Sequence, residues 1–278
     1  MHEQVYRQLA EVEDRLWWHE YRRSLIRLFL RGASLPKSAS ALDVGCGTGG
    51  SLGLLAEFAS RVVGIDRSPL AIELAKKKCA EADLRIADAA QLAEVFQPAS
   101  FDLITILNVL YHRWIPREVD LLKQVFRLLK PRGCVLITDA AFPCLFRKHD
   151  RIAMGTRRFR MPELRQKLGD AGFVGSAGTY FNMGMFPALW LSARWDGLRR
   201  WQIAEGDINE LAEPPKWIHH TLRLWASLEQ KAIRILGRLP LGASLICLAH
   251  KPGGETVRAE SRTRHVAGPF VPSGAALG

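Results

Sequence analysis

The chain has 278 residues, of which 48% are hydrophobic, and it carries a formal net charge of +11. This length allows one large domain or one domain with attached segments, and the hydrophobic content is enough for a buried core. The five cysteines are scattered without a C-x-x-C pair, and the longest apolar stretch is too short to span a bilayer. We therefore expect no zinc or other metal site and no disulfide framework. The first residues lack the pattern of a signal peptide, which favours a reducing, cytoplasmic setting.

Residues 1–31 have apolar side chains at the three- and four-residue spacing of an amphipathic helix. Within this segment Trp17 and Trp18 are adjacent, so they cannot share one face of a helix. One of them is expected at a ligand mouth or a domain contact; packing of both on the core is the alternative. Residues 34–40 include Pro36 and predict a linker, so residues 1–40 are interpreted as a helical lid with its linker.

Residues 41–50 join an apolar strand to a glycine turn and then to a helix, in the sequence ALDVGCGTGG. Glycines let the backbone approach a ligand closely, and a helix start offers free N–H groups and a positive dipole end. The glycines fit the G-x-G-x-x-G pattern of dinucleotide binding. They fit equally the loop of S-adenosylmethionine (SAM) methyltransferases, formed here by Asp43, Gly45, Gly47 and Gly49. The loop predicts a cofactor, and the acid within it favours SAM.

Strands and helices alternate through residues 41–138. Apolar runs predict strands at 41–44, 61–65, 84–87, 101–107 and 134–138. Helices are expected at 52–59, 70–81 and 117–129. The second of these follows Ser68 and Pro69, an N-cap residue and a proline at the first helical position. Apolar strands joined by helical crossovers are typical of a parallel, doubly wound sheet.

Polar residues follow four of these strands, at the edge where ligands bind in such sheets. Asp66 is placed to accept from both ribose hydroxyls, and Asp88 is placed to accept from the exocyclic amine of adenine. The N–H of Ala89 could meet a ring nitrogen, and Asn108 follows the fourth strand. Each acid alone could be a helix cap or turn residue. Acids after three successive strands, beginning with Asp43, favour a nucleoside-containing cofactor.

Residues 41–138 resemble the core of class I SAM-dependent methyltransferases, which have a Rossmann-like fold. The matching stretches are LDVGCGTG at 42–49, VGID at 63–66, ADA at 87–89, FDLI at 101–104, NVLYH at 108–112 and LKPRG at 129–133. The resemblance implies methyl transfer from SAM, with S-adenosylhomocysteine (SAH) as the product. The cofactor-binding residues we expect are Asp43, Gly45, Cys46, Gly47, Gly49, Asp66, Arg67, Asp88, Ala89, Asn108, Trp18 and Arg22. An NAD-dependent oxidoreductase becomes the minor alternative.

The segment with WW at 17–18 and RR at 22–23 resembles the leader helix of a bacterial subgroup of this family. Leu16 stands where that subgroup has a His, and within 149–159 Thr156 and Phe159 replace a His and a Tyr. The likeness covers residues 10–252. Such proteins are often methyltransferases of unassigned acceptor, many thought to act on saccharide or lipid-linked products. The replaced His and Tyr weigh against an acid/base role for that loop.

The resemblance implies a helix at 164–171, a sixth strand at 173–180 and a seventh at 245–250. The expected fold is therefore α/β, a doubly wound, mostly parallel seven-stranded sheet with an antiparallel last strand. Residues 41–181 and 244–252 would form the core, and 253–278 a loose tail. Residues 182–243 would be a helical insertion, with amphipathic helices at 185–195 and 221–236. This insertion is interpreted as an acceptor lid, a dimer contact or an element at the inner membrane surface. Its Arg and Trp residues suit anionic head groups or ordinary packing.

The expected activity is methylation of a small-molecule acceptor, most simply O-methylation of a saccharide, lipid-linked or secondary-metabolite substrate. A hydroxyl acceptor needs a base, and His112 is the first choice because its unperturbed pKa lies near neutrality. Tyr111 and His149 are weaker choices. A SAM-binding protein without catalysis is the alternative from another class.

Residues 147–167 carry eight Lys and Arg against Asp150 and Glu163, a net charge of 8 − 2 = +6. Such a stretch attracts phosphate-bearing substrates, nucleic acid or an anionic membrane, although it can also be a solvated surface. An RNA or DNA methyltransferase is disfavoured, because the stretch that begins at Asn108 lacks the prolines that follow strand four in base-amino methyltransferases. The oligomeric state stays open.

Overall fold

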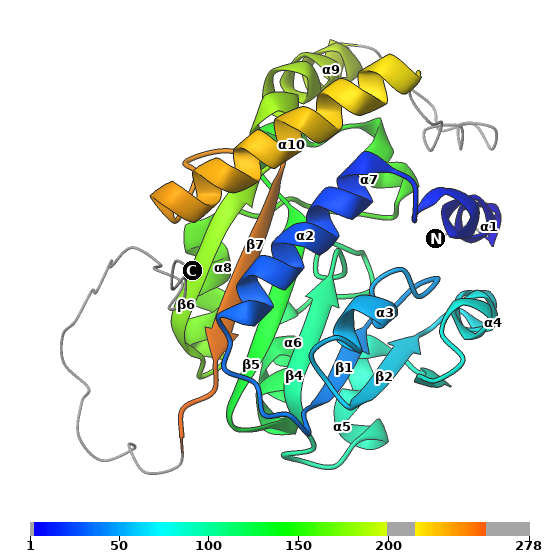
Figure 1. The fold of residues 1–278 in the computed structure, drawn as a ribbon, viewed down its shortest axis with the longest axis vertical. Helices are drawn as coiled ribbons and strands as arrows, with labels where there is room; N and C mark the ends of the chain where they lie inside the picture. The colour runs from blue at the N-terminus through cyan, green and yellow to red at the C-terminus, as the bar shows by residue number, and fades with distance from the viewer. Residues whose placement is uncertain (1–2, 199–214, 254–278) are drawn as a thin grey trace, which may run out of the picture.

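The computed structural model describes residues 3–198 and 215–253 (Figure 1). Its centre is a seven-stranded sheet in the order β3-β2-β1-β4-β5-β7-β6. The strands are β1 (Ser40–Val44), β2 (Arg61–Asp66), β3 (Asp83–Ile86), β4 (Phe101–Leu107), β5 (Leu129–Ala140), β6 (Val174–Phe181) and β7 (Ser244–His250). The first five strands run parallel to their neighbours in that order, whereas β7 is antiparallel to both β5 and β6. The predicted α/β fold class is therefore confirmed.

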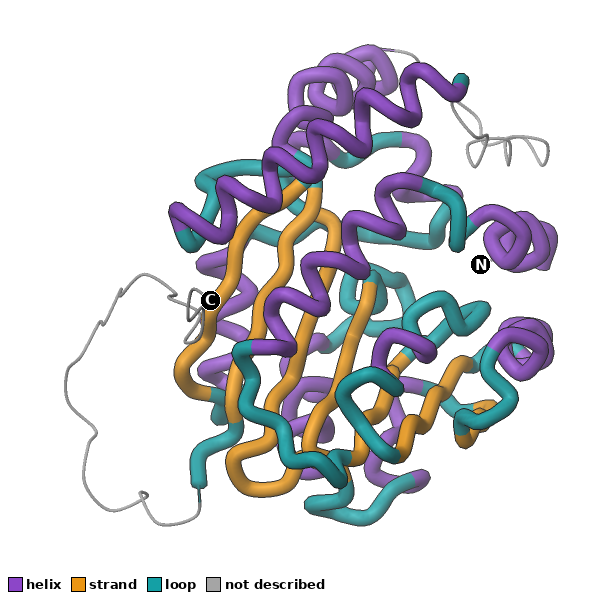
Figure 2. Tube along the Cα trace, in the orientation of Figure 1, coloured by secondary structure: helices purple, strands orange, loops and turns teal. Residues whose placement is uncertain are grey.

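Helices cover both faces of the sheet, and each face has its own apolar core. One core is shared with α2 (Trp17–Arg31), α3 (Leu52–Leu55), α4 (Pro69–Lys78) and α10 (Lys216–Leu236). The other is shared with α5 (Leu92–Val95), α6 (Glu118–Leu128) and α8 (Met161–Asp170). Figure 2 shows α2 and α10 crossing in front of the strands. Every residue of β4 is buried, as expected for a central parallel strand covered on both sides.

The single N-terminal helix predicted over residues 1–31 is in fact two helices, α1 (Glu3–Val12) and α2. The break has a physical reason, because Glu13 in the turn points its carboxylate at the core. This carboxylate accepts hydrogen bonds from Thr48 Oγ1 and Lys78 Nζ, both at 2.6 Å. The turn therefore ties α1 and α2 to the glycine loop and to α4.

Most other predicted elements are present with shifted ends. The N-cap role of Ser68 is confirmed, since its hydroxyl accepts from the Ala71 N–H at 3.3 Å. The helix predicted at 52–59 is regular only over Leu52–Leu55, and β5 begins five residues earlier than predicted, at Leu129 rather than Cys134. The linker predicted at 34–40 ends one residue sooner, because Ser40 pairs with Arg61 in β1.

The insertion between β6 and β7 holds α9 (Phe186–Leu198) and α10, both longer than predicted. The short 3-10 helix η3 (Met183–Met185) leads into α9. Large apolar side chains of α9 face solvent, among them Trp190, Leu191 and Trp195. The amphipathic pattern expected at 185–195 is thus weak, and none of the side chains described for α9 is fully buried. Residues 199–214 and the predicted tail after residue 253 lie outside the described residues.

The contact between α10 and α2 is anchored by a buried carboxylate. Glu229 is 4% exposed and accepts a hydrogen bond from the hydroxyl of Tyr21 at 2.7 Å. It also accepts from the backbone N–H groups of Asn182 and Met183, at 2.6 and 2.7 Å. One side chain of α10 therefore fixes both the N-terminal helix and the start of the insertion.

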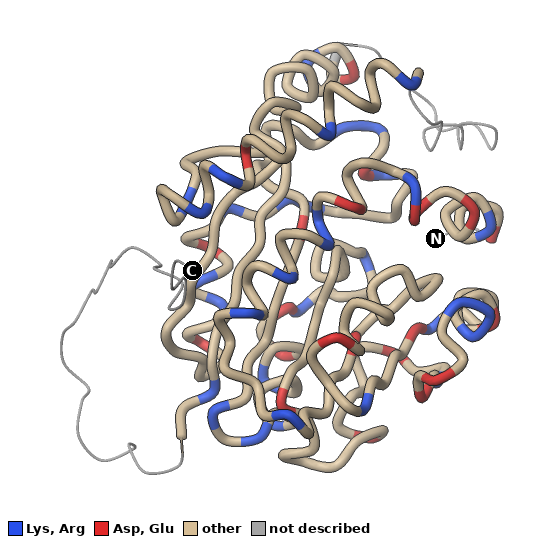
Figure 3. The backbone as a smooth tube through the Cα atoms, in the orientation of Figure 1, with Lys and Arg blue, Asp and Glu red and all other residues tan. Residues whose placement is uncertain are grey.

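Figure 3 shows charged residues at intervals along α10 and few along α9. Several cations of the basic stretch at 147–167 form ion pairs. Arg158 pairs with Asp150, and Arg157 pairs with Glu118 and Glu163. Because Glu118 lies outside the stretch, the net charge counted from residues 147–167 alone overstates how basic this surface is. Within the described residues, no helix combines the length and apolar character needed to cross a membrane.

Candidate active site

A cavity lies at the carboxyl ends of β1, β2 and β4, with α1 along one side. Most residues expected to bind a cofactor or to act on the acceptor line it, namely Arg22, Asp43, Gly45, Cys46, Gly47, Asp66, Arg67, Asp88, Ala89, Asn108, Tyr111 and His112. Two expected cofactor residues lie elsewhere. Gly49 packs against α4, since an added Cβ would lie 3.2 Å from the backbone of Ala75. Trp18 lines a neighbouring cavity.

The glycine loop takes a backbone shape that side chains rarely allow. Gly45 and Gly47 have positive φ angles of 73° and 55°. A Cβ on Gly45 would stand 2.6 Å from a methyl carbon of Val109, so this position also needs a close approach to the loop after β4. A Cβ on Gly47 would meet nothing within 4 Å. This glycine therefore leaves open space beside the cavity, where a cofactor can contact the bare backbone.

Asp43 ends β1 at the floor of the cavity and is 1% exposed. Burial raises its pKa to about 7, against the opposing effects of the Thr105 hydrogen bond and the Arg22 charge. The Thr105 hydroxyl donates to it at 2.6 Å. Above it, the Arg22 guanidinium bonds to Nδ1 of His19 at 3.0 Å. Its buried Nε has no hydrogen-bond partner among the described residues, so one N–H remains for a ligand.

Asp66 is held by its own surroundings, at the end of β2. One carboxylate oxygen accepts from the Gly47 N–H at 3.1 Å. The other accepts from the Ser68 N–H at 2.9 Å and from the hydroxyl of Tyr6, on α1, at 3.4 Å. Burial raises the pKa of this carboxyl group. Asp88 lies beside it in the cavity and also accepts from a backbone N–H, so both acids serve as turn residues and as cavity lining.

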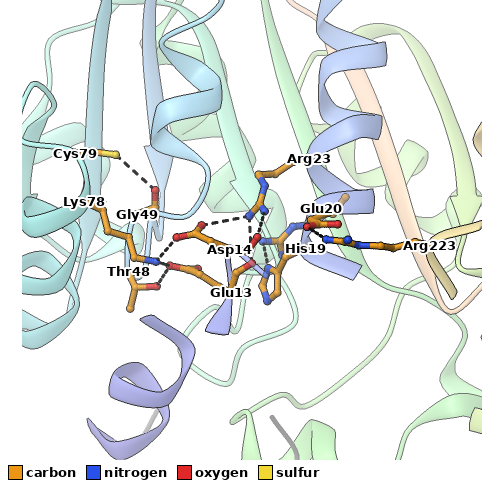
Figure 4. A network of polar contacts seen from close by, with 11 residues as sticks. Glu13, Asp14, His19, Glu20, Arg23, Thr48, Gly49, Lys78, Cys79 and Arg223 are labelled. Atoms are coloured by element: carbon orange, nitrogen blue, oxygen red, sulfur yellow. Dashed lines mark hydrogen bonds and ion pairs between the residues drawn. The ribbon is translucent and has the colours of Figure 1, made fainter. Parts of the chain in front are cut away.

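The structure adds residues that the sequence argument missed, and several come from α1, α2 and the turn between them. Tyr6, Leu9, Glu13 and His19 line the cavity together with Thr48 and Trp114. Figure 4 shows how Glu13 and Asp14 reach Lys78, while Glu20 pairs with Arg223 of α10. The only signal in the sequence was the apolar periodicity of residues 1–31, which does not say where a helix packs.

Three aromatic rings stack along one wall of the cavity. The His112 ring lies 4.3 Å from the Tyr111 ring and 5.3 Å from that of Trp114. Burial lowers the pKa of His112 to about 4, so this side chain is neutral at neutral pH. Burial raises the pKa of Tyr111, which keeps its hydroxyl protonated. The choice of His112 as a base rested on the near-neutral pKa of an unperturbed histidine, and burial lowers the pKa of this side chain below that value.

Asp139, near the end of β5, holds this wall in place from below. One oxygen of its carboxyl group accepts from the Ala140 N–H at 2.8 Å, and the other has no hydrogen-bond partner among the described residues. The N–H groups of Leu110 and Tyr111 lie near this carboxyl group. The side chain is fully buried, and burial raises its pKa to about 8. A protonated carboxyl group therefore positions the loop after β4.

A second cavity adjoins the first, and Asn108 and Tyr111 line both. Its other walls include Trp18, His149 and the ion pair of Arg158 with Asp150. Both oxygens of Asp150 accept from the Arg158 guanidinium at 3.0 Å. The first cavity, which is lined by glycines and acids, and the polar second cavity therefore lie on opposite sides of the wall formed by Asn108 and Tyr111. Across the described residues no three His, Cys, Asp or Glu side chains gather where they could hold a metal ion.

Comparison with known proteins gives a consistent family signal. A family model described as a methyltransferase domain matches residues 41–133. A probable S-adenosylmethionine-dependent methyltransferase of Mycolicibacterium smegmatis is 26% identical over 210 residues, covering 74% of this chain and 76% of the relative. The 2-methyl-6-phytyl-1,4-hydroquinone methyltransferase of Synechocystis is 25% identical and covers 76% of this chain and 67% of the relative.

Among solved structures, the fold resembles the phosphoethanolamine N-methyltransferase 2 of Haemonchus contortus in complex with S-adenosyl-L-methionine. The TM-score is 0.52 at 20% identity, over 82% of this chain and 52% of that one. A SAM-dependent methyltransferase of Archaeoglobus fulgidus gives a TM-score of 0.54 at 16% identity, over 84% and 94% of the two chains. At these identities the likeness supports the fold.

Proposed function

We propose that this chain, a SAM-dependent methyltransferase with the class I fold, methylates a hydroxyl group of a small-molecule acceptor held in the second cavity. The observation that carries the proposal is the wall shared by the two cavities, formed by Asn108 and Tyr111. Methyl transfer is an in-line displacement, so donor and acceptor atoms must face each other at such a boundary. Alignment of that kind is worth roughly 7–11 kcal/mol of the barrier. Relatives named for small-molecule acceptors support this substrate class.

The residues of the first cavity match the chemistry of SAM part by part. Arg22 offers a buried, unpartnered N–H to the methionine carboxylate, and Asp43 offers an acceptor to the ammonium group. Asp66 would accept from the ribose hydroxyls, and Asp88 with the Ala89 N–H would hold adenine. The cofactor supplies a methyl group on a positively charged sulfur, and the protein supplies position and electrostatics.

Of the two residues expected to act on the acceptor, Tyr111 lines both cavities, whereas His112 lines the first cavity alone. We assign Tyr111 to orient the acceptor hydroxyl by a hydrogen bond, with its ring fixed between His112 and the backbone near Gly155. The lowered pKa of His112 makes it a weak base in the free protein. The bond between the methyl carbon and the SAM sulfur would break as the bond to the acceptor oxygen forms, and the hydroxyl proton would pass to His149, the imidazole in the lining of the second cavity. Tyr111→Phe should therefore keep SAH affinity and reduce methyl transfer.

The first experiment measures cofactor binding by the shift of the thermal midpoint with SAM, SAH and NAD. A ligand at about 100 times its Kd adds roughly 2.7 kcal/mol, equivalent to a rise of about 5–11 °C for a chain of this size. Asp66→Ala should remove the response to SAH. Asp83→Ala, at the edge strand, is the matched control and should keep it. A response to NAD and none to SAM or SAH would refute the cofactor assignment.

The second experiment offers labelled SAM together with extracts of small molecules, saccharides, lipids and RNA. Labelled product in the small-molecule, saccharide or lipid fractions that disappears with Tyr111→Phe supports the proposal. Product in RNA alone would transfer the assignment to nucleic acid. SAM binding without product from any fraction would favour a SAM-binding protein that lacks catalysis.

A further inference from the structure

We infer that the acceptor is amphiphilic, and that its apolar tail lies in a third cavity between α2, η3 and α10. This inference rests on the proposed function for the position of the acceptor's head group. It adds a binding site for a hydrocarbon chain and so narrows the substrate class to molecules with a polar head and an apolar tail. We name the third cavity the tail groove.

The tail groove is lined mainly by apolar and aromatic side chains, and none of its lining residues is charged. They are Trp17, Tyr21, Asn182, Gly184, Met185, Thr221, Leu222, Trp225 and Ala226. Its hydroxyl groups have partners, since Tyr21 donates to Glu229 and Thr221 bonds to backbone carbonyls of its own helix. Such a surface offers few hydrogen bonds to a sugar or a phosphate. It suits a hydrocarbon chain, because burial of apolar surface is favourable without partners.

The tail groove is continuous with the second cavity at a defined junction. Trp17, Asn182 and Met185 line both. Methionine is unbranched and adapts its shape, which suits a passage that a ligand must enter. The three cavities therefore form a row. Asn108 and Tyr111 lie between the first and the second, and Trp17, Asn182 and Met185 lie between the second and the tail groove.

The junction also holds an open hydrogen-bond acceptor. Asn182 has a left-handed backbone, with φ of 60°, and its N–H is fixed by Glu229 at 2.6 Å. Its side-chain carbonyl oxygen is buried and has no hydrogen-bond partner among the described residues. A buried polar atom without a partner is costly, so a ligand that donates a hydrogen bond here would gain affinity. A hydroxyl or amide where the head group joins the tail has this chemistry.

The second cavity and the tail groove differ in polarity, and this difference selects the ligand. The second cavity contains the Arg158–Asp150 ion pair and His149, whereas the tail groove is apolar. A free sugar would leave the tail groove empty, and a simple hydrocarbon would make no polar contacts in the second cavity. An amphiphile satisfies both, with its hydroxyl near Tyr111 and its tail beside Trp225.

The test uses butyl, hexyl and octyl β-D-glucosides below their micelle concentrations, with SAH present, and measures Kd by calorimetry. If each added methylene is buried in the tail groove, Kd should fall about fourfold per methylene, the factor that corresponds to ~0.8 kcal/mol. Thr221→Trp fills the groove from an exposed position of α10 and should abolish this dependence. Ser227→Trp, exposed on the same helix and outside the groove lining, should preserve it.

A Kd that does not depend on chain length, or an unchanged dependence in Thr221→Trp, would overturn the inference. If Thr221→Trp does not fold, Met185→Asp puts a charge at the junction and should abolish the dependence in the same way. The assay needs no methyl transfer, so it separates the two proposals. If Kd depends on chain length but no acceptor fraction gives labelled product, the tail groove is supported and the proposed activity is refuted. If labelled product forms but Kd does not depend on chain length, the proposed activity is supported and the tail groove is refuted.

Discussion

Removal of the Arg158 guanidinium tests the buried ion pair that forms part of the wall of the second cavity. The side chains of Arg158 and Asp150 are 6% and 4% exposed, and two hydrogen bonds of 3.0 Å join them. Arg158 also donates to the carbonyl oxygens of Ala141 and Ala243. Arg158→Met keeps much of the volume but leaves a buried carboxylate without its partner, which costs about 3–5 kcal/mol. For a chain of this size the thermal midpoint should fall by about 6–20 °C.

The double variant Arg158→Met/Asp150→Leu removes the stranded charge as well. What remains unpaired is the N–H of Arg147 and the two carbonyl groups, so the double variant should lose only about 1–3 kcal/mol. Urea unfolding of both single variants and the double variant gives the coupling energy. Arg27→Met, which breaks an exposed pair with Glu57, is the control and should cost about 0–1 kcal/mol. The reasoning fails if Arg158→Met lowers the free energy of unfolding by no more than Arg27→Met does. It also fails if the loss in the double variant equals the sum of the losses in the two single variants.

Three further predictions concern the cofactor cavity. Gly45→Ala puts a side chain on a backbone with φ of 73° and against Val109, so SAH affinity and the thermal midpoint should fall. Gly53→Ala is the control and should change neither, because its Cβ would lie in open space. Glu13→Ala releases the turn between α1 and α2 and should cost about 1–3 kcal/mol and speed SAH dissociation in stopped flow, while Glu57→Ala should do neither. Burial raises the pKa of Asp139 to about 8, so this carboxyl group ionises at a lower pH in the unfolded chain than in the folded one. The free energy of unfolding should therefore fall as pH rises from about 4 to 8. Asp139→Asn should flatten this part of the decline in urea titrations at successive pH values.

The features that could be predicted from the sequence are those encoded by neighbouring residues. The acid and glycines at 43–47 sit between an apolar strand and a helix, and strand ends of a parallel sheet meet at one edge. Asp66 and Asp88 therefore could be placed beside that loop from their order along the chain alone. The strand positions followed from runs of buried residues, and Ser68 from local capping chemistry.

The features that could not be predicted depend on contacts between distant segments. Tyr21 meets Glu229 across 208 positions, and Glu13 meets Lys78 across 65. No periodicity in a single helix says which face of the fold it will cover. The same holds for His112, whose low pKa arises from burial by residues far along the chain. The net charge of residues 147–167 was misleading for the same reason, because Arg157 also pairs with Glu118, which lies outside that stretch.

The position of β7 between β5 and β6 has a consequence for the order of folding. Within the described sheet β6 pairs with β7 alone, so this edge of the sheet has no hydrogen-bonded place until Ser244–His250 arrives. During synthesis the chain must complete the whole insertion before the strand that closes the sheet leaves the ribosome. The last strand among the described residues thus closes the sheet, and a chain that ended before residue 244 would leave β6 unpaired.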